Sequence, residues 1–202
     1  MPNWNFTAYR VTGNKEKCAD LYNKIKSLED MKESLCENDF GKLWCGNLVH
    51  LLGGDENDYK NTYCRGHITG YELHPDGDLL FNVESAWSEL NQFRHFIEKA
   101  VGGIKIYHSS EEPGMELFRT NDKDGKYFPQ KYYLDISDDN NDVYETEYPE
   151  SLDEAKKILS EKFPETNFDF DNFDDVKKAI DDIHEKNEMV YITFEPYVFV
   201  DD

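Results

Sequence analysis

The order of strand-like and helix-like segments in the first 110 residues constrains the fold more than any other feature. Strand-type alternation and helix-type spacing of apolar residues divide this stretch into six elements. The predicted strands cover residues 4–12, 63–74, 78–83 and 103–109, and the predicted helices cover residues 15–28 and 89–101. Pro75-Asp76-Gly77 supplies the turn between the second and third strands. The order is therefore strand, helix, strand, strand, helix, strand.

This order predicts an α+β protein with a ferredoxin-like βαββαβ antiparallel sheet that has two helices on one face. Further strands are expected over residues 115–120 and 126–136, and a last one over residues 189–200. Two C-terminal helices complete the expected fold. N-cap residues mark the expected helix starts, because a short polar side chain accepts a hydrogen bond from the first turn. These caps are Asn14, Ser88, Ser151 and Asn172.

The domain organisation is expected to follow the change in composition along the chain. Residues 1–135 are expected to form the ferredoxin-like domain, with a lid insertion at about 29–60 that carries an apolar patch at 43–52. Residues 136–202 are expected to form an acidic α+β extension packed on it. Residues 135–202 contain 22 acidic residues and 6 lysines, so their net charge is −16, whereas the net charge of the whole chain is −21.

The acidic charge predicts the kind of partner. A strongly negative surface repels nucleic acid and anionic membranes, whose binding requires Lys and Arg. We therefore expect no nucleic-acid binding and no membrane binding, and a protein partner with a basic surface; the sequence specifies no oligomeric state. The first residues have no basic and apolar signal pattern, and the four cysteines form no Cys-x-x-Cys pair, so we expect a cytoplasmic protein.

Metal and catalytic motifs are weak. Cys45 and His50 with Cys64 and His67 have ligand types suited to zinc, but Cys64 and His67 lie three residues apart in a predicted strand and point to opposite faces. These same cysteines, each with a nearby histidine, are the one arrangement that suits nucleophilic catalysis. The chain has no phosphate-binding loop and no dinucleotide fingerprint. We therefore expect no metal and no cofactor, and the catalytic residues, if any, are not identified.

The open sheet face raises the alternative of RNA binding, because Tyr63, Arg65, His67 and Tyr71 are expected to share one face of the second strand. The aromatic RNA-binding motif of this fold is absent and the charge opposes phosphate, so we favour packing roles, including for Trp4, Trp44 and Trp87. The candidate functional patch is the place where five side chains could converge: Trp44, Arg65, His67, Glu84 and Trp87.

Several short motifs resemble those of a known family. Met-Pro-Asn-Trp at the start and Val11-Thr12-Gly13 at the end of the first strand are similar to the YubB-type ferredoxin-like domain family of plasmid and phage proteins. The resemblance continues in three segments over roughly residues 1–135: Gly66-His67-Ile68, Leu80-Phe81 with Glu84-Ser85-Ala86-Trp87-Ser88, and Glu112-x-Gly114-Met115. The family commonly has Pro-Pro after the Ala-Trp-Ser step, where this chain has Glu89-Leu90. The resemblance implies the ferredoxin-like fold and a mobile-element origin, and it transfers no catalytic residue.

Three functions remain open from the sequence. The first is a non-enzymatic accessory protein of a mobile genetic element that acts by protein–protein contact through its acidic half. The second is an acidic DNA mimic that inhibits a DNA-binding protein. Six lysines count against this hypothesis, because they interleave with the carboxylates of the two C-terminal helices and would neutralise a phosphate-like ridge. The third is a small-molecule hydrolase-like enzyme with a pocket near Trp44. We favour the first, which makes an enzyme the less expected outcome.

Overall fold

The computed structural model of the protein describes residues 3–62 and 64–201. The chain forms a mixed α+β structure with two compact units. Unit 1 comprises Met1–Lys123 and Phe199–Asp202, and unit 2 comprises Asp124–Val198. The expected boundary between residues 135 and 136 falls inside a strand of unit 2.

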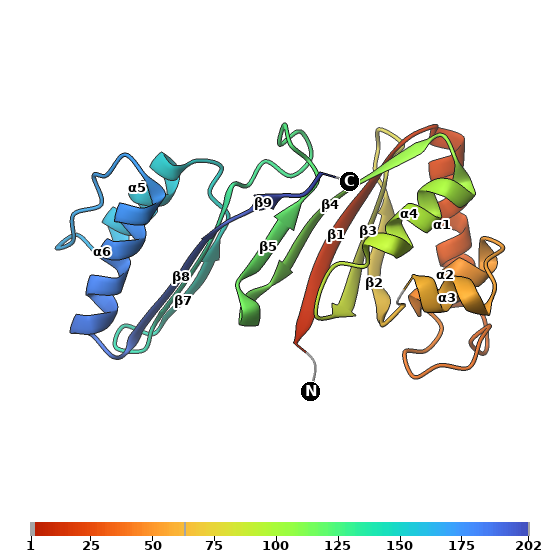
Figure 1. Cartoon of the computed structure of the whole chain (residues 1–202), viewed down its shortest axis with the longest axis horizontal. Helices are drawn as coiled ribbons and strands as arrows, with labels where there is room; N and C mark the ends of the chain where they lie inside the picture. The colour runs from red at the N-terminus through yellow and green to blue at the C-terminus, as the bar shows by residue number, and fades with distance from the viewer. Residues whose placement is uncertain (1–2, 63, 202) are drawn as a thin grey trace. The chain divides into compact units, whose positions relative to one another are not determined.

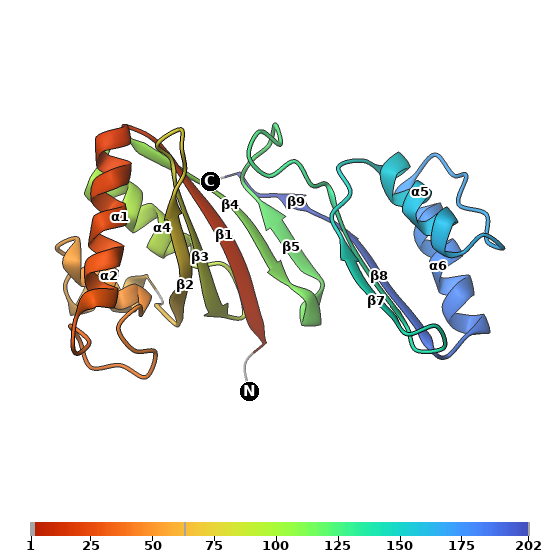
Figure 2. The ribbon, with the colours of Figure 1, turned by 180° about the vertical axis from the view of Figure 1, so that it is seen from behind.

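Unit 1 is built on a six-stranded sheet with the order β2-β3-β1-β4-β5-β9. In this sheet β1 pairs antiparallel with β3 and β4, β2 pairs antiparallel with β3, and β4 pairs antiparallel with β5. Helices α1 and α4 lie on the same face of the sheet (Figures 1 and 2). The strands are β1 (Trp4–Gly13), β2 (Gly66–Leu73), β3 (Leu79–Ala86), β4 (Ile104–Glu112), β5 (Leu117–Thr120) and β9 (Val198–Phe199), and the helices are α1 (Lys15–Asp30), α2 (Cys45–Leu51), α3 (Glu56–Asn61), α4 (Asn91–Val101) and the short η1 (Pro113–Met115).

The helix-covered face of β1 begins with polar residues. Asn5, Thr7 and Tyr9 are buried, whereas Trp4 and Phe6 on the opposite face are 39% and 50% exposed. Thr7 donates a hydrogen bond to the Asn5 amide oxygen, and the Asn5 amide donates to Ser110 on β4, so this buried polar set is hydrogen-bonded. Of the three tryptophans expected to pack in the core or at its rim, Trp44 packs against the core, whereas Trp4 and Trp87 are 39% and 45% exposed.

A β-bulge changes the expected face of the second strand. The register between β2 and β3 shifts between Ile68 and Gly70, which reverses the alternation of side chains beyond that point. Tyr71 consequently meets Tyr22 of α1 edge to face, and its hydroxyl donates to Glu29, while His67 stays on the other face beside Glu84. Tyr71 and His67 therefore do not share a face as predicted. Tyr63, the fourth residue of that prediction, lies outside the described residues.

The helix caps are confirmed at three of the four predicted positions. Asn14, Ser151 and Asn172 each accept a hydrogen bond from the first turn of the helix that follows. Ser88 does not cap α4, because Trp87 adopts a left-handed backbone with φ of 75° and the helix begins only at Asn91, after Leu90, which has no capping side chain.

Unit 2 has its own sheet and its own core. The three-stranded antiparallel sheet has the order β7-β6-β8, and helices α5 and α6 cover one of its faces (Figures 1 and 2). Its elements are β6 (Tyr132–Asp138), β7 (Val143–Glu147), α5 (Leu152–Lys162), α6 (Phe173–Lys186) and β8 (Val190–Pro196). The predicted strand over 126–136 begins later, at Tyr132; Pro129 within the predicted range has no N–H to donate to a ladder.

Candidate functional site

The five residues of the predicted patch lie in two places in unit 1. His67 of β2 pairs across the sheet with Glu84 of β3, and Trp44 forms an isolated bridge with His67 just before α2. Arg65 and Trp87 instead line a separate hollow at the end of β3. In the described part of the chain, no hydrogen bond or ion pair connects Arg65, His67 and Glu84, so the three do not form a common catalytic group.

Trp44 and His67 have structural partners. The indole N–H of Trp44 donates to the carbonyl of Cys64, and its ring meets Tyr59 edge to face at 5.7 Å between ring centres. The His67 ring stacks on Phe40 at 6.2 Å. The Trp44 ring also lies so close to Gly46 that a Cβ there would be 2.2 Å from it. Trp44 therefore holds α2 against the start of β2.

The hollow beside Trp87 has a volume of about 250 Å³, slightly below the range typical of small-molecule sites. The left-handed φ of Trp87 is unusual for a large residue, and such strain is found more often at functional positions. Its lining residues are Thr62, Arg65, Ala86, Trp87, Ser88, Glu89, Leu90, Asn91 and Gln92. Because Arg65 and Glu89 have opposite charges and no activated nucleophile lies in this set, the hollow suits binding of a small polar group rather than covalent catalysis.

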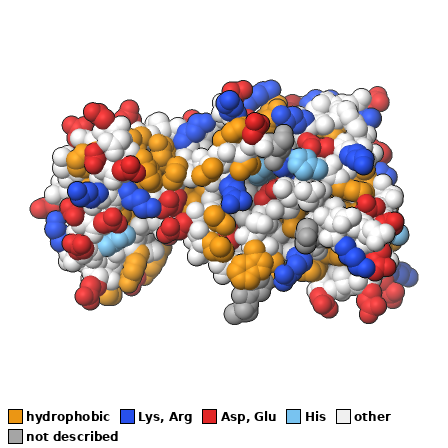
Figure 3. All heavy atoms as spheres, in the orientation of Figure 1, with side chains coloured by type: hydrophobic (Ala, Val, Ile, Leu, Met, Phe, Trp, Pro, Cys, Tyr) orange, Lys and Arg blue, Asp and Glu red, His pale blue; other side chains and the backbone are white. Residues whose placement is uncertain are grey.

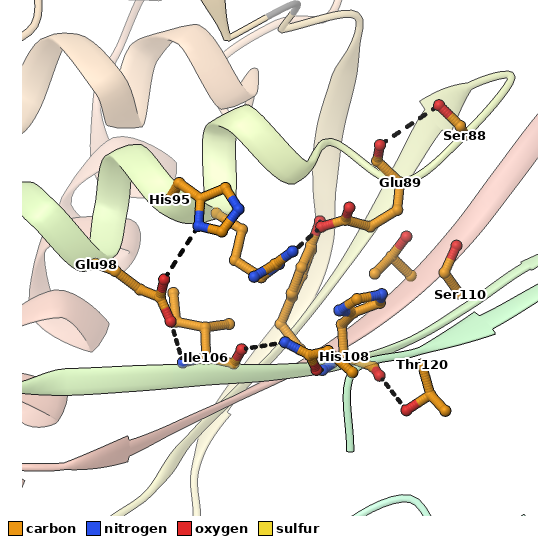
Figure 4. Close-up of polar contacts among 12 residues, drawn as sticks. Ser88, Glu89, His95, Glu98, Ile106, His108, Ser110 and Thr120 are labelled. Carbon is orange, nitrogen blue, oxygen red and sulfur yellow. Dashed lines mark hydrogen bonds and ion pairs between the residues drawn. The ribbon is translucent and has the colours of Figure 1, made fainter. Parts of the chain in front are cut away.

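A buried ionic network lies beside this hollow, under the first turn of α4 (Figure 4). The Glu89 carboxylate accepts hydrogen bonds from the Tyr9 hydroxyl at 2.9 Å and from Arg94 Nε at 3.1 Å. Burial, followed by the negative charge of Glu89, raises the pKa of Tyr9 well above its usual value, so the phenol stays protonated and remains a donor. Figure 4 shows Glu89 at the start of α4 above His108 of β4, which is itself buried. The network fixes the start of α4 on the sheet.

The sequence interpretation missed this network, although a signal for it exists. Arg94 follows Phe93 on the helical stripe that also carries Leu90 and Ile97, so a charged side chain occupies a position that faces the sheet. A charged residue on such a stripe requires a buried partner of opposite charge. Glu89, five residues earlier, provides it.

The four residues considered for zinc are not brought together. Cys45 and Cys64 are buried, and His50 is exposed with its Nδ1 atom 2.7 Å from the Tyr59 hydroxyl. Among the described residues, no group of three or more His, Cys, Asp and Glu side chains is placed to hold a metal ion. Burial raises the pKa of Cys64 to about 11 and that of Cys45 well above its usual value, so both remain thiols near neutral pH. Nucleophilic chemistry requires the thiolate and is therefore disfavoured at both.

Unit 2 carries most of the negative charge, and its helical lysines are largely paired. Residues 124–198 contain 21 acidic residues and 8 lysines, a net charge of −13. Of the six lysines on α5 and α6, Lys156 and Lys157 pair with acids on their own helix, Lys162 pairs with Glu145, and Lys177 pairs with Glu195. The other two, Lys178 and Lys186, line a hollow of about 370 Å³ with Asp175, Asp182 and Glu165. Figure 3 shows Lys side chains interspersed with Asp and Glu side chains over unit 2, which has no Arg.

The helix-free face of the unit 2 sheet has a different composition. We call it the tyrosine face. By strand register and alternation it comprises Tyr133, Asp135, Ser137, Tyr144, Thr146, Tyr191, Thr193 and Glu195. None of these eight residues is basic, and Tyr144 and Tyr191 are 63% and 66% exposed. Sequence reasoning did not identify this face.

Comparisons with known proteins provide no name for this arrangement. No protein-family model matches the chain, and no curated protein matches it. A solved structure, described as "Crystal Structure of an Unknown Protein from Galdieria sulphuraria", is similar over 96% of this chain and 98% of its own, with 13% sequence identity and a TM-score of 0.26. At that TM-score the similarity carries no argument. Separately, the part of the chain that the structure describes contains no helix with the length and apolar character of a membrane span.

Proposed function

We propose that the protein acts by binding another protein through unit 2, without catalysis. The observation that carries this proposal is that an acidic unit with its own core exposes large tyrosines on the sheet face left uncovered by helices. Tyrosine is enriched where proteins bind one another, because its ring supplies a large contact area and its hydroxyl a hydrogen bond. The net charge of −13 favours a partner with a basic surface.

DNA mimicry is less well supported. A mimic requires carboxylates spaced like phosphates along a rigid ridge. On α5 and α6, Lys156 and Lys157 form ion pairs within their own helix, and Lys178 and Lys186 lie beside Asp175 and Asp182. These lysines interrupt any such ridge with positive charge. The pattern therefore favours protein contact over imitation of a duplex.

The hydrolase-like alternative near Trp44 is also less well supported. Trp44 is committed to packing against Tyr59 and the start of β2, and the two buried cysteines near it have raised pKa values. Binding of another protein does not require a reactive Trp44 side chain or reactive cysteine thiols, so these observations favour the binding function over the hydrolase-like one.

For unit 1 we further propose the ferredoxin-like fold and membership of the YubB-type family. The strand order β2-β3-β1-β4 and two helices on one face support the fold assignment. Of the resembling segments, Gly66-His67-Ile68 lies on β2 and Ala86-Trp87-Ser88 lies where β3 ends before α4, as the resemblance to a strand that ends in an Ala-Trp-Ser step implies. In this proposal the protein is a cytoplasmic accessory protein of a plasmid or phage.

The experiment is affinity capture of the tagged full-length chain from its host at physiological salt, followed by cross-linking and mass spectrometry. We expect a protein partner whose cross-links fall on residues 124–198. The matched control is a chain in which exposed helical carboxylates Asp181 and Glu185 are replaced by Asn and Gln. Recovery of no specific protein, or cross-links confined to unit 1, contradicts the proposal, as does turnover of a small molecule by the pure protein.

A further inference from the structure

We infer that the tyrosine face of unit 2 binds an extended Lys- or Arg-rich segment of a partner protein, with one cation placed over Ser137 and Asp135. This inference rests on the proposed function and specifies the surface and the partner's chemistry. The occupant follows from charge complementarity, because the face exposes Tyr144 and Tyr191 beside the half-buried carboxylate of Asp135, has no basic residue of its own, and belongs to a unit with a net charge of −13; its other carboxylate, Glu195, is already paired with Lys177.

The register places the two exposed tyrosines on either side of a small residue. Ser137 on the central strand β6 pairs with Tyr144 on β7 and with Tyr191 on β8, so all three side chains point to the same side of the sheet. Two strand spacings separate the tyrosines by roughly 10 Å. In this inference the cation lies above Ser137, between the two tyrosines; a cation interacts with an aromatic face within about 6 Å of the ring centre.

The next row of the face supplies the counter-charge. Asp135 pairs with Thr146 on β7 and Thr193 on β8, and lies two residues from Ser137 on the same side of β6. The Thr146 hydroxyl donates to Asp135 Oδ1 at 2.6 Å, which orients the carboxylate. In the described part of the chain Oδ2 accepts no hydrogen bond, so it is the atom placed to accept one from a Lys or Arg side chain. Charge-assisted hydrogen bonds of this kind are among the stronger polar contacts.

Each of the two exposed tyrosines has a contact with a neighbouring side chain. The Tyr144 hydroxyl donates to Asp139 Oδ1 at 2.8 Å, and the Tyr191 ring lies 6.5 Å from His184. His184 is itself fixed, because its Nε2 accepts the backbone N–H of Ile192 at 2.9 Å. These contacts restrict the two rings, and a side chain that is already restricted loses less conformational freedom on binding.

The test measures binding of a fluorescent synthetic peptide of alternating Arg and Ser to the full-length chain by anisotropy. A strand-like peptide of this sequence presents all its Arg side chains on one side. We expect binding that weakens with added salt, and no binding of the matched Glu-Ser peptide. Replacing both Tyr144 and Tyr191 by Ala is expected to weaken binding by at least tenfold, as is Asp135→Asn. The Tyr→Phe double variant, which keeps both rings, is expected to retain most of the affinity.

Three outcomes overturn the inference: no binding of the Arg peptide, equal affinity for the Tyr→Ala double variant, or an equal loss caused by the charge-matched helical control Glu185→Gln. Thermal unfolding of each variant confirms that the exposed substitutions leave the fold intact. A tyrosine face occupied by a second copy of the chain also contradicts the inference, and sedimentation detects it. If a protein partner cross-links to unit 2 yet is captured equally by the Tyr→Ala variant, this inference fails while the proposed function stands.

Discussion

At the scale of single residues, the buried pair of Arg94 and Glu89 is the most consequential contact in unit 1. Their side chains are 1% and 9% exposed, and Glu89 also accepts the Tyr9 hydroxyl. An ion pair of this kind is not by itself strongly stabilising, but removal of one partner leaves the other charged in a poorly solvated site. The contact therefore matters most when half of it is lost.

Arg94→Met is expected to lower the free energy of unfolding by about 3–5 kcal/mol, because the Glu89 carboxylate loses its cation while it stays buried. Urea unfolding followed by circular dichroism measures the change. The double variant Glu89→Gln with Arg94→Met removes both charges and is expected to recover a large part of that loss. If the double variant is as unstable as the single one, the loss arises from packing and not from the unpaired charge.

The turn between β2 and β3 carries a second residue-scale prediction. The backbone N–H of Asp78, helped by His74 and Arg10, lowers the pKa of Asp76 to about 2 from its usual 3.8. The folded chain therefore binds this proton less readily than the unfolded chain, so the stabilisation is present above about pH 4. It is lost as the pH falls through about 2.

Asp76→Asn is expected to abolish this part of the pH dependence. Urea unfolding at several pH values between 4 and 2 should show a shallower decrease in stability for the variant than for the native chain. Glu188→Gln, an exposed change after α6, is the control and should follow the native curve. If the stability of Asp76→Asn depends on pH in the same way as that of the native chain, the lowered pKa of Asp76 does not contribute to the pH dependence of stability.

At the scale of elements, two helices of similar sequence pattern begin in different ways. The Asn172 amide oxygen accepts the backbone N–H of Asp175 at 3.0 Å and thereby caps α6. Ser88 stands before α4 in the sequence but lies outside it in the structure, where α4 begins at Asn91. A capping motif predicts a helix start only if the following residues continue helically, and here the non-helical Glu89 and Leu90 lie between Ser88 and the helix.

Asn172→Ala is expected to destabilise unit 2 by about 1 kcal/mol through loss of the cap. Ser88→Ala is expected to change stability by less than about 0.5 kcal/mol, because its side chain caps no helix. Urea unfolding of the two variants side by side makes the comparison. An equal cost at both positions would contradict the structural account of α4.

At the scale of the whole molecule, each unit has a core of its own. The buried cluster of unit 2 includes Leu134, Leu159, Val176, Ile180 and Phe194, and every member lies between residues 134 and 194. The strand β6 is central in its sheet, with β7 and β8 on either side. The core and the sheet of this unit are therefore complete within residues 124–198.

A fragment of residues 124–198 is consequently expected to fold by itself, with dispersed amide signals in a two-dimensional NMR spectrum. A fragment of residues 136–202, which follows the boundary expected from the sequence, lacks the first half of the central strand and is expected to remain unfolded. If the fragment of residues 136–202 folds, or the fragment of residues 124–198 is disordered, the division into these two units is contradicted.

The candidate sites illustrate what sequence reasoning found and missed. It selected Arg65 and Trp87, which the fold brings to one hollow, together with His67 and Glu84, which lie elsewhere on the sheet. It missed the tyrosine face, because alternation within a strand shows that Tyr144 and Thr146 share a side but not whether helices cover that side. The helix positions α5 and α6 decide that question through contacts distant in sequence.

The sequence by itself determined the order of six elements of unit 1, β1, α1, β2, β3, α4 and β4, and three of the four helix caps, since hydrophobic period, turns and caps are local properties of neighbouring residues. The tertiary structure alone decided which side of each strand became the core. Asn5 and Thr7 are buried because Thr7 donates to Asn5 and Asn5 donates to Ser110 on β4, whereas Trp4 on the opposite face is exposed. The bulge after Ile68 turns Tyr71 toward α1. These outcomes depend on register and pairing between residues far apart in the chain, and no local pattern records them.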